Sequence, residues 1–173
     1  MKLKEIKTDR LTLREMNMDD WRDYISHVIE ADEIYIQYGE EPTEEFLDEI
    51  QEPTPGVIYY SIRITDTDQR VGYIGILERK DNIEYHIYKE HRNHHYCTEA
   101  LKAFMREYMS GEITGDQHDS VNADTFLENE PSCHVLENAG FKKDGAGFCL
   151  SLNPKTHSLS LDAVRIKYIY KED

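Results

Sequence analysis

Three runs of alternating apolar and polar residues in the middle of the chain constrain its fold most strongly. They cover residues 57–64, 70–77 and 82–88, and only "TDTDQ" and "ERKD" separate them. Alternation with period two is typical of half-buried β-strands, and the residues between the runs favour turns. Connections this short leave no room for a parallel crossover, so the sequence predicts an antiparallel meander.

Further elements are expected on both sides of the meander. "LTLR" at residues 11–14 alternates like a strand, and helices are predicted over residues 19–30 and 42–50. After the meander, a helix is expected to begin near Thr98 and to bury one apolar face, formed by Leu101, Phe104, Met105 and Tyr108. "SVNADTF" then reads as a strand, and "GFCLSL" and "AVRIKYIY" as two closing strands.

The segment "NEPSCHVLENAGF" at residues 129–141 has clear signals for both ends of a helix. Asn129 is expected to cap its first turn, and Pro131 is tolerated there because first-turn amides lack helical partners. Gly140 fits the left-handed position that ends many helices, with Phe141 packing back on the helix.

The element order is therefore β-α-α-β-β-β-α-β-α-β-β. It predicts an α/β (α+β) fold in a single domain over residues 1–173. We expect a mixed, mostly antiparallel sheet of about six to seven strands, flanked by about four helices. One strand–helix–strand crossover should follow Tyr88.

The charge of the chain argues against some classes of partner. Thirty-five acidic and 20 basic residues give a formal net charge of −15. Such a field repels nucleic acids and anionic membranes and attracts cations and amines, although it also serves solubility. No apolar run is long enough to span a bilayer, and three cysteines without metal-type spacing suit a reducing cytoplasm.

Four segments, in order, resemble the GNAT superfamily of N-acetyltransferases, and within it the branch of ribosomal-protein N-terminal acetyltransferases. They are "TDRLTLREM", "VGYIGI", "EYHIYKEHRNHHYCTEAL" and "NEPSCHVLENAGF". The resemblance implies acetyl-coenzyme A as acetyl donor and a primary amine as acceptor, either a protein N-terminus or a small amine such as a polyamine. It leaves open whether the protein is a monomer or a homodimer.

In this family a loop with the pattern Arg/Gln-x-x-Gly-x-Gly/Ala holds the pyrophosphate through backbone N–H groups at the start of a helix. The corresponding loop here reads Arg92-Asn93-His94-His95-Tyr96-Cys97. The positions that the resemblance implies in cofactor binding are Ile87, Tyr88, Arg92, Asn93, His94, His95, Tyr96, Cys97, Thr98 and Asn129.

The loop departs from the family pattern at His95, which stands where the family has glycine. Asn93 replaces another frequent glycine, but asparagine tolerates a positive φ. Either the His95 side chain points away while the backbone keeps the usual turn, or it blocks the cofactor. A metal site built from His91, His94, His95 and Cys97 is a further alternative, against a solvated His-rich loop.

Acetyl transfer requires a proton acceptor for the amine, a hydrogen-bond donor for the oxyanion and a proton for the leaving thiolate. The resemblance implies that a backbone N–H around Ile87 and Tyr88 serves the oxyanion. Candidates for the base are Glu84, His86, Asp124 and Glu128, of which Glu84 and His86 alternate onto one strand face. An ordinary solvent-face role for Glu84 and His86 is the alternative.

Many family members protonate the thiolate with a tyrosine four residues after the serine of the Asn-x-x-Ser helix. That position is Leu136 here, which carries no exchangeable proton, so Ser132 becomes the candidate acid. A first-turn capping hydroxyl explains Ser132 equally well, and helix capping explains Asn129. The rival function is a non-catalytic module of this fold that binds coenzyme A or an amine ligand.

Overall fold

The computed structural model describes residues 3–30, 57–77, 82–152 and 159–171. Within these ranges the strands are β1 (Ile6–Lys7), β2 (Leu11–Glu15), β3 (Ile58–Ile64), β4 (Arg70–Leu77), β5 (Asn82–Ile87), β6 (Val121–Phe126), β7 (Lys142–Leu152) and β8 (Leu159–Tyr170). The helices there are α1 (Met18–Glu30), α3 (Tyr96–Met109), α4 (Glu130–Ala139) and the short 3₁₀ helix η1 (Lys89–His91). The helix predicted at residues 42–50 lies outside the described ranges.

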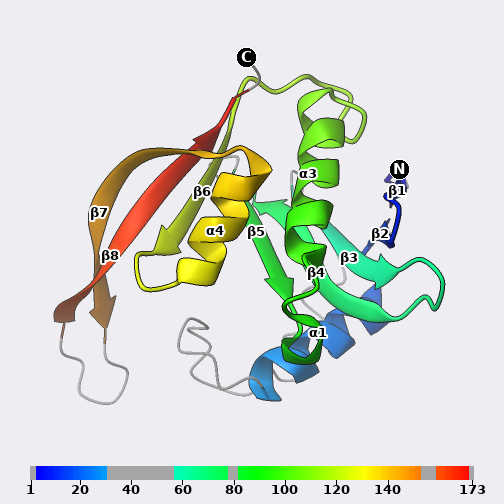
Figure 1. Ribbon diagram of the computed structural model, residues 1–173, viewed down its shortest axis with the longest axis horizontal. Coiled ribbons are helices and arrows are strands. Elements are labelled where there is room, and N and C mark those ends of the chain that lie inside the picture. Colours follow the sequence, from blue (N-terminus) through cyan, green and yellow to red (C-terminus); the bar gives the residue numbers. More distant parts are fainter. Residues whose placement is uncertain (1–2, 31–56, 78–81, 153–158, 172–173) are drawn as a thin grey trace.

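One sheet joins all the strands, in the order β1-β2-β3-β4-β5-β6-β8-β7 (Figure 1). Every neighbouring pair is antiparallel except β5 and β6, which run parallel. The predicted meander is confirmed as β3-β4-β5, and the predicted crossover is confirmed as β5-α3-β6. The short strand β1 is additional to the strands that the sequence predicted.

Helices cover both faces of the sheet, because successive strand residues point in opposite directions. On β3, the ring of Tyr59 packs edge-on against Trp21 of α1, with 5.0 Å between centroids. The next residue, Tyr60, packs against Phe104 of α3 at 5.8 Å. Thus α1 lies on one face, and α3, with α4 beside it, lies on the other (Figure 1).

The apolar core lies between the sheet and α3. The α3 face predicted from the sequence is buried as expected, at Leu101, Phe104, Met105 and Tyr108. Strand residues with no more than 1% exposure meet it, among them Leu11, Leu13, Ile62, Ile74 and Ile76. No helix in the described parts of the chain has the length and apolar character needed to cross a membrane.

Helix α4 begins and ends as its sequence predicts. The Ser132 backbone N–H donates to Asn129 Oδ1 at 3.3 Å, so Asn129 caps the helix. Gly140 adopts a left-handed conformation with φ 101°, a region that other residues enter only at a cost. Phe141 follows and is buried.

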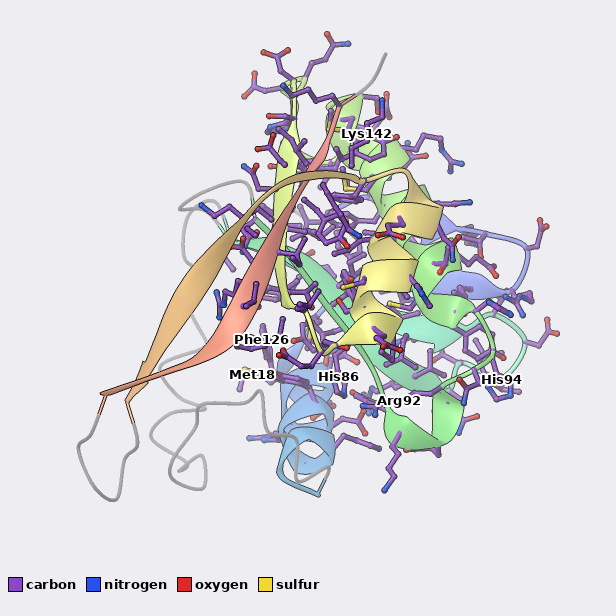
Figure 2. All side chains as sticks on the ribbon, turned by 60° about the vertical axis from the view of Figure 1, so that its left-hand side comes forward. Met18, His86, Arg92, His94, Phe126 and Lys142 are labelled. Carbon is purple, nitrogen blue, oxygen red and sulfur yellow. The ribbon has the colours of Figure 1, made fainter. Side chains whose placement is uncertain are left out.

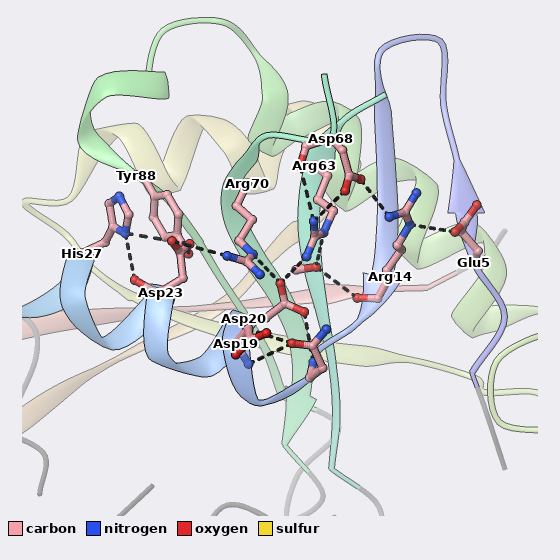
Figure 3. A network of polar contacts seen from close by, with 12 residues as sticks. Glu5, Arg14, Asp19, Asp20, Asp23, His27, Arg63, Asp68, Arg70 and Tyr88 are labelled. Atoms are coloured by element: carbon pink, nitrogen blue, oxygen red, sulfur yellow. Dashed lines mark hydrogen bonds and ion pairs between the residues drawn. The ribbon is translucent and has the colours of Figure 1, made fainter. Parts of the chain in front are cut away.

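A buried carboxylate fixes the beginning of α1 to the sheet (Figure 3). Asp20 is 2% exposed, and its Oδ1 accepts hydrogen bonds from Arg63 Nη2 at 2.5 Å and Arg70 Nε at 2.7 Å. The two arginines come from β3 and β4 respectively. An ion pair of this kind is costly to break from one side, because the remaining charge then stays buried without its partner.

The later part of α1 contacts the chain directly after the end of β5 (Figure 3). Tyr88 donates its hydroxyl hydrogen to Asp23 Oδ2 at 2.9 Å, and the His27 ring stacks on the Tyr88 ring at 3.8 Å. His27 Nε2 lies 3.2 Å from Glu90 Oε1 of η1. Helix α1 therefore supports the segment that leads from β5 into α3.

Replacing Asp20 tests whether this anchor stabilises the fold. Asp20→Ala should lower the free energy of unfolding by about 3 kcal/mol, because Arg63 and Arg70 lose their shared buried partner. Urea denaturation measures the change. Asp19→Ala is the matched control, because Asp19 is exposed and its ion pair with Arg22 spans 3.7 Å; a change within about 0.5 kcal/mol is expected. Equal losses in both variants would contradict a special role for Asp20.

Candidate active site

The parallel strands β5 and β6 separate soon after they meet. Among the described residues their register contains a single pair, Asn82 with Asn122, although β5 continues to Ile87 and β6 to Phe126. Figure 1 shows the two strands diverging beyond this point. Backbone groups on the facing edges of the strands are then available to a ligand, at the carboxyl ends where α/β folds commonly bind one.

The open edge of β5 presents the backbone of Ile87. The N–H of the next residue, Tyr88, donates to the carbonyl oxygen of Val71 on β4 at 2.9 Å. Because successive N–H groups of a strand point to opposite edges, the Ile87 N–H points toward the β6 side. Arg92 Nε reaches the same edge and donates to the Ile87 carbonyl oxygen at 3.0 Å. Of the two amides expected to serve an oxyanion, the one at Ile87 is suitably directed.

Gly72 of β4 lies opposite Ile87, on the paired edge of β5. A Cβ atom at position 72 would lie 2.0 Å from the carbonyl oxygen of His86, a distance that no side chain tolerates. The residue therefore permits an unusually close approach of the two strands. This approach helps to set where the end of β5 lies.

The loop between η1 and α3 reaches the turn conformation without glycine. Asn93 and His95 both have positive φ, at 64° and 62°. Alternating left-handed residues of this kind turn successive N–H groups toward one side, which makes an anion-binding concavity. The first helical hydrogen bond of α3 runs from the Glu99 N–H to the His95 carbonyl oxygen at 3.1 Å.

The first turn of α3 keeps its amides available. His95 occupies the capping position, but its side chain makes no capping hydrogen bond. The N–H groups of Tyr96, Cys97 and Thr98 precede the first helical bond and thus have no partner within the helix. Orphan amides and the helix dipole together favour an anion at this end.

Both imidazoles of the loop, those of His94 and His95, are exposed to solvent. In Figure 2 His94 lies at the margin of the molecule, with Arg92 between it and His86 in this view. His94 Nδ1 lies 2.8 Å from the Arg92 carbonyl oxygen, so this nitrogen donates. The His94 ring also stacks on Tyr96 at 5.3 Å. Its contacts thus close the loop on itself.

Cys97 packs against the apolar core rather than standing among the histidines. Burial raises the pKa of its thiol to about 12, so the group is a protonated thiol at neutral pH. Among the residues that the structure describes, no three His, Cys, Asp or Glu side chains converge as a metal site would require. The geometry of this loop therefore favours contact through its backbone.

We call the region between the diverging strands β5 and β6 the opening. On its far side from β5, the first turn of α4 contains Ser132. Ser132 Oγ lies 2.9 Å from the hydroxyl oxygen of Tyr85, which comes from β5. The same phenol lies 3.3 Å from the Ser132 carbonyl oxygen. The hydroxyl of Ser132 thus meets a side chain of the facing strand, while its backbone N–H is capped by Asn129. Leu136 is buried in the core.

The other face of β5 carries Glu84 and His86, under α1. Tyr59 donates its hydroxyl hydrogen to Glu84 Oε2 at 3.1 Å. Burial raises the pKa of the Glu84 carboxyl, and this hydrogen bond opposes part of the rise. A carboxylate with a raised pKa is a better proton acceptor at neutral pH than an ordinary one. The His86 ring lies over Tyr73 at 6.1 Å and near Tyr88 at 6.2 Å.

The four candidate bases thus occupy different surroundings. Glu84 and His86 lie together on the half-buried α1 face of β5, as their alternation predicted. Asp124 of β6 and Glu128, in the turn before α4, are both exposed. No pattern in the sequence points to Tyr59 or Tyr85, because each meets its partner through packing between segments remote in the chain.

Comparison with known proteins identifies the family. A model of the acetyltransferase (GNAT) domain matches residues 10–142. No curated protein sequence matches the chain. An acetyltransferase of the GNAT family from Bacillus anthracis superposes with a TM-score of 0.74 at 19% identity, over 97% of this chain and 98% of that one.

Two ribosomal-protein acetyltransferases have the same architecture. RimL, a ribosomal L7/L12 alpha-N-protein acetyltransferase solved with coenzyme A, superposes with a TM-score of 0.74 at 15% identity, covering 98% of this chain and 99% of that one. The ribosomal-protein-S5-alanine acetyltransferase from Vibrio fischeri gives 0.72 at 11% identity, with 98% and 97% covered. At such identities, these superpositions establish a shared fold.

The left-handed conformation of His95 makes a prediction about stability. His95→Gly should raise the free energy of unfolding by roughly 0.5–1 kcal/mol, because relief of the strained φ outweighs the greater freedom of the unfolded chain. His94→Gly is the control and should lower it, since His94 lacks a positive φ and loses its bond to the loop carbonyls. Thermal and urea unfolding report both values. A loss of stability in His95→Gly would contradict the observed turn.

Glu84 makes a prediction about pH. Folding raises its pKa, so the protonated form favours the folded state, and this contribution is lost as pH rises through the raised pKa. Glutamine stays neutral at every pH. The urea midpoint of Glu84→Gln, measured relative to that of wild type, should therefore rise between about pH 4.5 and pH 8. Glu90→Gln is the opposing control, because a backbone hydrogen bond, with His27 nearby, lowers the pKa of Glu90. Parallel pH profiles for Glu84→Gln and wild type would contradict the burial effect.

Proposed function

Because the chain belongs to the GNAT acetyltransferase family, we propose that it transfers the acetyl group of acetyl-coenzyme A to a primary amine. The amine attacks the thioester carbonyl directly, with no covalent enzyme intermediate. The protonated, core-packed thiol of Cys97 is consistent with direct attack, because a thiol nucleophile acts as its thiolate. The cysteines described in the structure are free, which suits work in a reducing cytoplasm.

The observation that carries this proposal is the uncapped start of α3 beside the open edge of β5. In the proposed complex the amides of Tyr96, Cys97 and Thr98 bind the pyrophosphate, while the loop from Arg92 to His95 curves around it. Positively charged Arg92 adds to the attraction at the mouth of this site. Asn129 and the main chain at Ile87 and Tyr88 line the path toward the thioester.

The residues of the opening divide the chemistry among them. The Ile87 N–H stabilises the oxyanion as the carbonyl carbon becomes tetrahedral. Glu84 accepts one proton from the ammonium, which frees the amine lone pair for attack, with His86 beside it on the same face. Ser132, on the opposite side, supplies a hydrogen to the sulfur as the carbon–sulfur bond breaks. Overall the ammonium loses two protons: one ends on the thiol sulfur, and the other leaves through Glu84 to solvent.

The acceptor is proposed to be a cationic primary amine. A net charge of −15 attracts cations over a distance of about a Debye length. Two of the superposed structures are enzymes named for ribosomal-protein substrates, so a protein N-terminus is one candidate. A small polyamine is the other, and the enzyme would act on either as a monomer or a homodimer.

A non-catalytic module remains the second candidate, because His95 and Leu136 replace residues that the family uses. The two candidates differ in one measurable respect. An enzyme binds acetyl-coenzyme A and releases free thiol when an acceptor is present, whereas a binding module retains the ligand unchanged. Titration calorimetry combined with thiol release from a panel of amines and N-terminal peptides separates them.

Charge reversal at the loop makes the binding test quantitative. Arg92→Glu should weaken coenzyme A binding at least about tenfold, near 1.4 kcal/mol, because a negative charge then faces the pyrophosphate. Arg106→Glu is the matched control, since it changes net charge equally from the exposed far end of α3. It should stay within about twofold. Equal weakening in both variants, or no binding to wild type at about 1 mM, would contradict the proposed cofactor site.

A further inference from the structure

We propose that Tyr85 is a positioning residue for Ser132, holding the serine hydroxyl so that its hydrogen is directed to the leaving sulfur. This inference rests on the proposed function. It is carried by the contact between the Tyr85 hydroxyl and Ser132 Oγ at 2.9 Å. The contact joins β5 to the first turn of α4, so it links the two sides of the opening.

The hydrogen-bond inventory of the two hydroxyls gives the contact a direction. Tyr85 has a single hydroxyl hydrogen, and its phenol lies closer to Ser132 Oγ, at 2.9 Å, than to the Ser132 carbonyl oxygen, at 3.3 Å. A phenol is also more acidic than an alkyl hydroxyl, so Tyr85 is the better donor of the pair. When Tyr85 donates to Ser132 Oγ, the serine hydrogen is not used within the pair. Ser132 is then the donor that the departing sulfur needs.

The surroundings keep both groups in place. Ser132 is fixed through its backbone N–H, which donates to Asn129 Oδ1 at 3.3 Å. Tyr85 is part of a paired strand, opposite Ile74 of β4, and its ring packs against the apolar core. Burial raises the pKa of the Tyr85 phenol above its ordinary value, so it stays a protonated donor throughout the working pH range.

The step is balanced without any further reagent. The amine lone pair forms the new carbon–nitrogen bond, the carbon–sulfur bond breaks, and sulfur keeps that electron pair. The Ser132 hydrogen passes to sulfur, and the serine oxygen regains a proton, through water, from the nitrogen, which loses it on becoming an amide. Tyr85 keeps its own proton and strengthens the acidity of Ser132 by donating to its oxygen. The phenol thus acts through Ser132 and does not touch the reacting atoms.

The positioning role of Tyr85 is consistent with the loss of the tyrosine that many family members have in the Asn-x-x-Ser helix, where this chain has Leu136. Leu136 is 1% exposed and has no proton to give. A phenol is nevertheless hydrogen-bonded to Ser132, but it belongs to the strand that faces the helix. The serine therefore gains a donor partner from across the opening.

A double-mutant cycle tests the inference in the full-length chain. Tyr85→Phe removes only the hydroxyl, so kcat should fall about tenfold. The KM for acetyl-coenzyme A should stay within about twofold of wild type, and the thermal unfolding midpoint within about 2 °C. Ser132→Ala should lower kcat further. The double variant should match Ser132→Ala, because the phenol has no effect once the serine hydroxyl is absent. Thiol release with the acceptor found active for wild type is the measurement.

Tyr168→Phe is the matched control. Tyr168 comes from β8, and its hydroxyl donates to Glu137 Oε1 at 3.1 Å instead of meeting Ser132. Any loss of kcat in Tyr168→Phe should therefore add to the loss in Ser132→Ala. Replacing Tyr85 by 3-fluorotyrosine keeps the hydroxyl and should preserve kcat even if Tyr85→Phe proves unstable. An active wild type with additive losses at positions 85 and 132, or with unchanged kcat in Tyr85→Phe, overturns the inference alone. A wild type inert toward every acceptor overturns the proposed function itself.

Discussion

The parting of β5 and β6 after a single residue pair is the constraint on which the rest of the site depends. Two parallel strands joined through α3 cannot form a hairpin, and here they also stop pairing at once. Each strand therefore leaves an unpaired edge inside the molecule. The backbone of Ile87, the start of α3 and the start of α4 all lie near that gap, because α3 follows the end of β5 and α4 follows the end of β6.

The polar groups around the gap fall into two classes with different physical roles. Asp20 with its two arginines, and the contacts of Tyr88 and His27, fix the position of α1 on one face of the sheet. Glu84 and Ser132 lie where those fixed elements leave room, each with a tyrosine hydroxyl as partner. The anchored elements thus surround the two groups to which the proposed reaction assigns proton transfer.

Much of the fold could be predicted because its signals are local. Period-two runs with short connections predicted the meander, and Asn129 and Gly140 defined α4 almost to the residue. The long-range partners could not be predicted: Asp20 meets Arg63 and Arg70, and Tyr85 meets Ser132, across more than 40 positions of sequence. Nothing in spacing or composition specifies which buried side chains face one another. The same limit applies to the site, where the family resemblance supplied Ser132 and the structure supplied its neighbour.

Gly72 has a consequence for how such a protein can diversify. Position 72 of β4 lies so close to β5 that only a hydrogen atom fits there. The neighbouring strand β4 therefore helps to fix where the Ile87 amide lies. In the proposed enzyme, residues that contact the acceptor can therefore change without moving this amide. The choice of acceptor and the placement of the oxyanion donor then depend on different positions of the chain.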